Sequence, residues 1–84
     1  MIRVLYFARL REQLGVGSEA LPAPGTPASV EDIVTTLRGR GGLWAEAFEP
    51  NQTLLVAVNQ ELARWDTQVS DGDELAFFPP VTGG

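Results

Sequence analysis

The sequence predicts an α+β fold in which a mixed β-sheet carries one main helix across one of its faces. Short runs of β-branched and aromatic residues recur along the chain, and between them lies one segment with apolar residues at helical spacing. With 84 residues, the chain can form one domain with one modest core. We therefore expect a single domain over residues 1–78, followed by an extended tail over residues 79–84.

The main helix is predicted to follow Ser29. Apolar residues lie at i, i+3, i+4 and i+7 from this point, which gives a helix a single apolar stripe. These residues are Val30, Ile33, Val34 and Leu37. Ser29 and Asp32 resemble a capping box, which satisfies free amides at a helix start. The helix should end near Gly39, and residues 43–48 are expected to add a short helical turn.

The remaining elements are predicted from residue type and turn signals. Strands are expected over residues 2–8, 18–21, 53–58, 62–65 and 74–78, a short helix over 9–14, and turns at 59–61 and 71–73. Alternation predicts that one face of the sheet packs against the helix through Ile2, Val4, Tyr6, Leu75 and Phe77. Residues 53–58 are almost wholly apolar, which is typical of a central strand buried on both faces. This order of elements indicates a β-grasp arrangement.

The same alternation places Leu5, Phe7 and Phe78 on the opposite, open face of the sheet. Two phenylalanines on an open face form a candidate contact patch. The alternative is that one of these rings folds back into a small satellite core. Trp44 and Trp65 are expected to be packed anchors rather than rings that stack on a cofactor.

Composition excludes several kinds of function. The chain contains no cysteine, histidine or lysine, so it lacks the usual nucleophiles, general bases and transition-metal ligands. We expect no metal site and no catalysis by the chain alone. Its net charge of -5 disfavours nucleic acid and anionic lipid, and favours a protein partner with a basic surface. No apolar run approaches the roughly 20 residues that span a bilayer, and no secretory signal is evident, so a cytoplasmic location is expected.

The tail consists of Pro79, Pro80, Val81, Thr82, Gly83 and Gly84. Two prolines favour extended backbone and remove two amide donors, so the tail should leave the sheet. Its six residues can reach about 20 Å, at roughly 3.3 Å each. Glycines without a Cβ fit a narrow pocket. A Gly-Gly ending alone is shared by ubiquitin-type modifiers and by thiamine-pathway sulfur carriers, and also arises by coincidence.

Several segments together resemble the small, sulfur-carrying subunit family of molybdopterin synthase. The similarity runs through residues 2–8, 11–12 and 55–60, and it is most specific over 71–84. Residues 39–52 match least. The resemblance implies a ubiquitin-like β-grasp fold, and it identifies Phe7, Leu62 and Phe78 as the apolar patch that grips partner proteins.

The resemblance also implies the chemistry. The Gly84 carboxylate would be adenylated by an ATP-using activating enzyme, with AMP transiently linked to Gly84 and no permanently bound cofactor. A sulfur donor would then convert it to a thiocarboxylate. Residues 79–83 would insert into the large synthase subunit, in a heterotetramer with two copies of each chain. There the sulfur would pass to cyclic pyranopterin monophosphate to form the molybdopterin dithiolene.

Two other functions stay open at this point. The first is a ubiquitin-like protein modifier, or a sulfur carrier of another pathway of the thiamine or tRNA thiolation type, which would use the same activation of Gly84. The second is a binding module whose tail has no role. The lack of lysine excludes chains of this protein linked to itself by isopeptide bonds, but not conjugation to other proteins.

Overall fold

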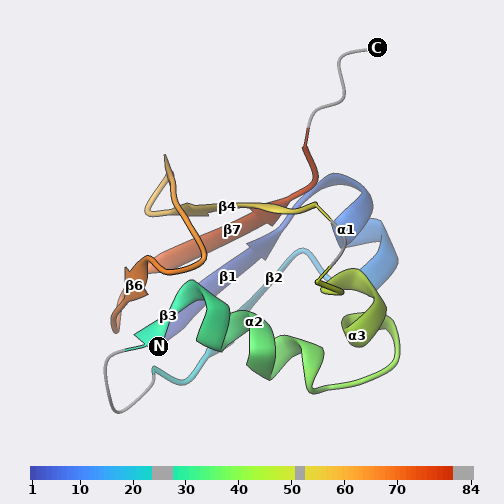
Figure 1. Ribbon diagram of the computed structural model, residues 1–84, viewed down its shortest axis with the longest axis horizontal. Coiled ribbons are helices and arrows are strands. Elements are labelled where there is room, and N and C mark those ends of the chain that lie inside the picture. The colour runs from blue at the N-terminus through green and yellow to red at the C-terminus, as the bar shows by residue number, and fades with distance from the viewer. Residues whose placement is uncertain (24–27, 51–52, 81–84) are drawn as a thin grey trace.

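The computed structural model, which describes residues 1–23, 28–50 and 53–80, contains a five-stranded mixed sheet (Figure 1). In spatial order its strands are β2 (Ser18–Leu21), β1 (Ile2–Tyr6), β7 (Glu74–Phe78), β4 (Leu55–Val58) and β5 (Glu61–Leu62). β1 and β7 are parallel, and the other neighbours are antiparallel. The predicted mixed sheet is confirmed, and the first and last strands of the chain pair within it.

Three helices and a small second sheet complete the described part of the chain. They are α1 (Ala8–Leu14), α2 (Val30–Arg38), α3 (Leu43–Ala47) and the strand pair β3 (Ala28–Ser29) and β6 (Gln68–Val69). The predicted capping box starts α2: the Ser29 Oγ accepts from the Asp32 amide at 3.3 Å, and the Asp32 carboxylate accepts from the Ser29 amide at 2.9 Å. β3 and β6 were not predicted, because two residues are too few to show a periodicity.

The core lies between one face of the main sheet and the helices α2 and α3. The sheet contributes Ile2, Val4, Tyr6, Val56, Leu75 and Phe77, and the helices contribute Val30, Ile33, Val34, Leu37 and Ala47. The predicted helix stripe and the predicted inward face of β1 and β7 are therefore both confirmed. Phe48, which follows α3, is also buried and packs edge-on against Phe77 at 5.4 Å between ring centroids.

The prediction for residues 53–58 was partly wrong. A strand forms over Leu55–Val58, but it is not central and not buried on both faces, since Leu55 is 36% exposed. The central strand is β7, which lies between β1 and β4. The helices of the described chain cover one face of the sheet only, so apolar side chains of β4 that point the other way meet solvent.

Two predicted boundaries also shift. Asn59 and Gln60 both have positive φ, as in a two-residue type I′ hairpin turn, so β5 begins at Glu61 and the expected strand over 62–65 ends at Leu62. β1 ends at Tyr6 rather than at residue 8, because the chain turns at Ala8, with φ 55°, to begin α1. That helix ends at Gly15, whose left-handed backbone favours glycine.

A polar and aromatic cluster ties β2 and the segment after α2 to β1. The Tyr6 hydroxyl donates to Glu19 at 2.8 Å, and Arg40 binds both oxygens of Glu19 at 2.9 and 2.8 Å. Arg40 also lies over the ring of Trp44, 4.4 Å from its centroid, so Trp44 is packed as predicted. The bidentate Arg40 contact lowers the pKa of the Glu19 carboxyl, while burial and the bond to Glu19 raise the pKa of the Tyr6 phenol.

This cluster predicts a pH dependence of stability for Glu19→Gln. A carboxyl whose pKa is lower in the folded state than in the unfolded state stabilises the fold at pH values above its unfolded pKa. This stabilisation is lost as pH falls through the folded pKa. The wild-type chain should therefore exceed the variant in free energy of unfolding at pH 7, by no more than about 1 kcal/mol because the pair is partly exposed. The difference should begin to shrink as pH falls through about 4.3, the ordinary glutamate pKa, and should disappear at still lower pH. Urea unfolding over this pH range measures this, and a constant difference would contradict it.

Candidate functional site

The candidate site lies at the end of the sheet where β7 finishes and the tail begins. Parallel pairing with β7 brings the end of β1 to the same end of the sheet: Tyr6 lies opposite Phe77, and the Phe7 amide donates to the Phe77 carbonyl at 3.2 Å. β7 ends at Phe78, and Pro79 follows it directly. Segments near the two ends of the sequence therefore meet at one end of the sheet (Figure 1).

An apolar patch occupies the open face of the sheet at this end. Phe78 pairs directly with Leu55 of β4, and Phe7 flanks Phe78 on the β1 side. Leu62 lies one row further in and is 74% exposed, while Phe7 is 45% exposed. We call Phe7, Leu55, Leu62 and Phe78 the apolar patch. Phe7 therefore remains at the surface rather than folding into a satellite core.

The middle of this face has a shallow floor. The row behind Phe78 crosses the sheet from Leu5 through Ala76 and Ala57 to Leu62, according to the strand register. The two alanines at its centre have the smallest side chains that still carry a Cβ. A partner's apolar side chain could therefore fit between Leu5 and Leu62 and contact the sheet closely.

The face becomes polar at its other end. Arg3 lies opposite Glu74 in the sheet. The side chain of Asn59 bonds to Glu74 and Asp73: its oxygen accepts from the Glu74 amide at 3.0 Å, and its nitrogen donates to the Asp73 carboxylate at 3.1 Å. Beyond them, the Met1 ammonium donates to Asp71 and lowers the pKa of that carboxyl. The apolar surface is thus confined to the end of the sheet from which the tail starts.

Of the predicted tail, Pro79 and Pro80 are half-buried and lie outside any strand. Val81, Thr82, Gly83 and Gly84 lie outside the described residues, so the prediction for them remains a prediction. Leu55 is a patch member that the sequence analysis missed, because an unbroken apolar run gives no sign of which face stays uncovered.

The patch can bind but has no group for proton transfer, since its four members are all hydrocarbon side chains. Over residues 1–23, 28–50 and 53–80, no group of three or more acidic residues is placed to hold a metal ion. In the same ranges, no helix has the length and apolar character needed to cross a membrane. The four apolar side chains therefore form a surface suited to contact with another protein.

Comparison with known proteins agrees with this geometry. The ThiS family model matches residues 4–84. The chain is 45% identical, over 100% of its length and of theirs, to the molybdopterin synthase sulfur carrier subunits of Escherichia coli and Haemophilus influenzae. It is 34% identical to that of Chlamydomonas reinhardtii, covering 99% of this chain and 98% of the relative.

Solved structures share the same fold. A putative molybdopterin converting factor subunit 1 from Pyrococcus furiosus superimposes with a TM-score of 0.77 at 31% identity, covering 95% of this chain and 97% of that one. SAMP1 from Haloferax volcanii gives 0.76 at 30% identity, covering 99% and 98%. The chain therefore belongs to the ThiS family of ubiquitin-like β-grasp proteins. Within it, the chain groups with the sulfur carrier subunits of molybdopterin synthase, so the resemblance seen in the sequence is confirmed.

Substitutions of Phe7 and of Phe77 test the binding role of the patch and the stability of the core separately. Phe7→Arg should change the free energy of unfolding by no more than about 0.5 kcal/mol, as is usual for surface positions. It should weaken binding to the large subunit of molybdopterin synthase by about tenfold or more, since it places a charge in an apolar contact. Thermal unfolding and calorimetric titration measure the two effects.

The matched control is Phe77→Ala, which empties a fully buried site and should destabilise the fold by about 3–5 kcal/mol. A stability loss of that size for Phe7→Arg would show that Phe7 belongs to the core and would overturn its assignment to the patch.

Proposed function

We propose that the chain is the sulfur carrier subunit of a molybdopterin synthase and that Gly84 carries the sulfur as a terminal thiocarboxylate. The observation that carries the proposal is the apolar patch beside the start of the tail, in a chain 45% identical over its full length to such subunits. A binding surface beside the point where the tail begins suits a protein that docks on a partner and delivers its own terminus.

Activation of Gly84 must precede sulfur transfer, because a carboxylate is a poor acyl donor until one of its oxygens becomes a leaving group. Adenylation by an ATP-using activating enzyme achieves this and links AMP transiently to Gly84. A sulfur donor then displaces AMP and leaves the thiocarboxylate. The chain has no cysteine, so it cannot carry the sulfur as a cysteine persulfide.

The large subunit receives the loaded tail in this proposal. The patch docks on it, and residues 79–84 extend by up to about 20 Å toward its active site. The thiocarboxylate sulfur then bonds to a carbon of cyclic pyranopterin monophosphate as an oxygen leaves that carbon. Water cleaves the resulting thioester, which returns the Gly84 carboxylate and leaves the sulfur on the pterin, and a second loaded chain supplies the second sulfur of the dithiolene. General acids and bases come from the large subunit, because this chain has no histidine, cysteine or lysine. Two copies of each subunit form the enzyme.

A solved complex supports the choice of partner. A structure of subunits 1 and 2 of the molybdopterin-converting factor from Helicobacter pylori contains a chain of the same fold, with a TM-score of 0.66 at 21% identity over 99% of this chain and 97% of that one. That likeness shows the fold, and in that structure the two subunits form a complex. The activating enzyme, in our proposal, docks on the same patch at a different time.

Conjugation to other proteins is the second candidate function. The observation that favours it is the similarity to SAMP1 of Haloferax volcanii, described as a small archaeal modifier protein. Both functions need an activated Gly84, so activation alone does not separate them. Peptide mapping of cell extract does: isopeptide links between Gly84 and lysines of other proteins support the modifier, and their absence alongside a free thiocarboxylate supports the carrier.

The terminus itself provides the direct test of the proposed function. Adding one residue beyond Gly84 moves the carboxylate by about 3.8 Å and turns its former position into an unreactive amide. Because a misplacement near 1 Å can reduce the rate about a hundredfold, product formation from cyclic pyranopterin monophosphate should fall by at least that factor. Deleting Gly84 should have the same effect.

Both terminal variants should retain the stability and the large-subunit affinity of the wild type, since the patch is untouched. The assay contains the large subunit, the activating enzyme, ATP and a sulfur donor. Activity near that of the wild type in either variant would show that Gly84 does not carry the sulfur.

A further inference from the structure

A second surface feature lies beside the apolar patch: the indole of Trp65, in the loop after β5. Trp65 is 38% exposed. It stacks on the buried ring of Phe77, with centroids 6.3 Å apart and planes 18° from parallel. One face of the indole is therefore directed at the core, and the opposite face is the one available to solvent.

The loop that carries Trp65 is held in place by backbone hydrogen bonds. The Trp65 carbonyl accepts from the Glu31 amide at the start of α2, at 2.9 Å. Arg64 and Thr67 close a turn around it: the Arg64 amide donates to the Thr67 hydroxyl at 3.0 Å, and the Thr67 amide donates to the Arg64 carbonyl at 3.1 Å. The exposed ring face is thus positioned in the free protein, which reduces the entropy lost on binding.

Trp65 also lies on a surface continuous with the apolar patch. A hollow beside the ring is lined by Leu54, Leu55 and Ala63 together with Glu31 and Asp66. Leu55 belongs both to this hollow and to the patch. A partner that covers the patch can therefore extend past Leu55 around the side of β4 and reach the hollow beside Trp65.

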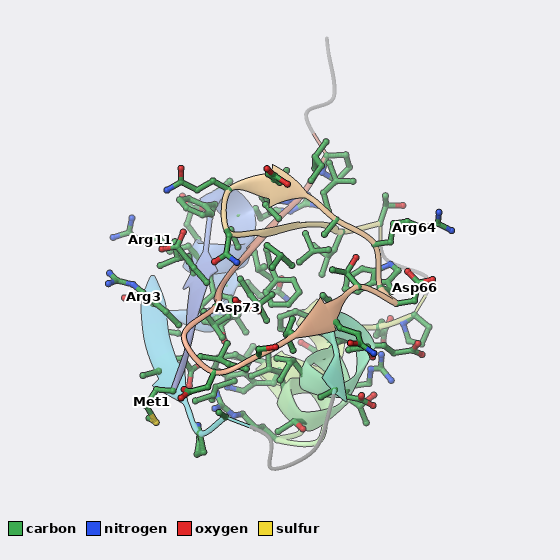
Figure 2. The ribbon with its side chains drawn as sticks, turned by 90° about the vertical axis from the view of Figure 1, so that its left-hand side faces the viewer. Met1, Arg3, Arg11, Arg64, Asp66 and Asp73 are labelled. Atoms are coloured by element: carbon green, nitrogen blue, oxygen red, sulfur yellow. The ribbon has the colours of Figure 1, made fainter. Side chains whose placement is uncertain are left out.

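Two of the residues that line this hollow are acidic, Glu31 of α2 and Asp66 of the loop, and one is basic, Arg64. Asp66 contacts Arg64 at 3.8 Å, but both side chains are highly exposed, at 79% and 86%, and such pairs contribute little. Figure 2 shows Arg64 and Asp66 on the side of the molecule away from Arg3 and Arg11. An aromatic face beside carboxylates attracts a cation, because ring quadrupole and carboxylate charge act in the same direction.

We infer that the large subunit, when it covers the apolar patch, places an arginine or lysine side chain on the exposed face of Trp65, between Glu31 and Asp66. The inference rests on the proposed function, because it takes the large subunit as the partner. The incoming cation takes the place of Arg64 beside Asp66. It adds a charged contact to an otherwise apolar interface and fixes the rotation of this chain on its partner.

The test measures the affinity of the full chain for the large subunit by calorimetric titration at low and high salt. Trp65→Leu keeps an apolar side chain but removes the aromatic face, and it should weaken binding about three- to tenfold. Trp65→Phe keeps a ring and should stay within about threefold of the wild type. The double variant Glu31→Gln with Asp66→Asn should weaken binding at low salt and reduce the dependence of affinity on salt.

Glu12→Gln in α1 is the control for the loss of an exposed carboxylate that does not line the hollow beside Trp65, and it should leave the affinity unchanged. Thermal unfolding of every variant shows whether folding is intact; neither the Phe variant nor the double variant removes a buried side chain. The inference is overturned if the double variant keeps both the affinity and the salt dependence of the control. If the wild-type chain does not bind the large subunit at all, the proposed function fails first.

Discussion

The parallel pairing of β1 with β7 is the constraint on which the rest of the site depends. Its register sets Tyr6 opposite Phe77, so both strands finish at the same end of the sheet. Phe7 from the start of the chain then flanks Phe78 from its end, and the tail begins beside them. A slip of one residue would exchange the faces of β7 and turn Phe78 into the core. The register thus fixes the fold and the binding surface together.

The helices of the described chain cover only one face of the sheet, so the side chains that this register places on the other face form an exposed surface. On the covered face, the rings of Tyr6, Phe48 and Phe77 pack together, with their centroids within 6.4 Å of one another. On the other face, the same strands present apolar side chains that no helix of the described chain covers. Trp65 connects the two regions, since its inner face packs on Phe77 and its outer face meets solvent beside Leu55.

Sequence reasoning succeeded where the evidence was local and periodic. Alternation along residues 2–7 and 74–78 assigned the buried and open faces correctly, and helical spacing identified the buried stripe of α2. It failed for residues 53–58, because an apolar run does not show how many layers cover a sheet, and Leu55 was missed for that reason. The exposed face of Trp65 depends on a contact with Phe77, twelve positions away, that no local pattern encodes. The role of Gly84 was predicted from resemblance and from the missing nucleophiles.

The central claim is that sulfur resides on Gly84, and intact-mass analysis of the chain tests it most directly. The full chain is incubated with activating enzyme, ATP and a sulfur donor, and its C-terminal peptide is then sequenced by mass spectrometry. The account predicts the mass increase that corresponds to one oxygen replaced by sulfur, located on Gly84 and dependent on ATP. An unmodified Gly84 under conditions that load an established sulfur carrier, or sulfur found on any other residue, would contradict it.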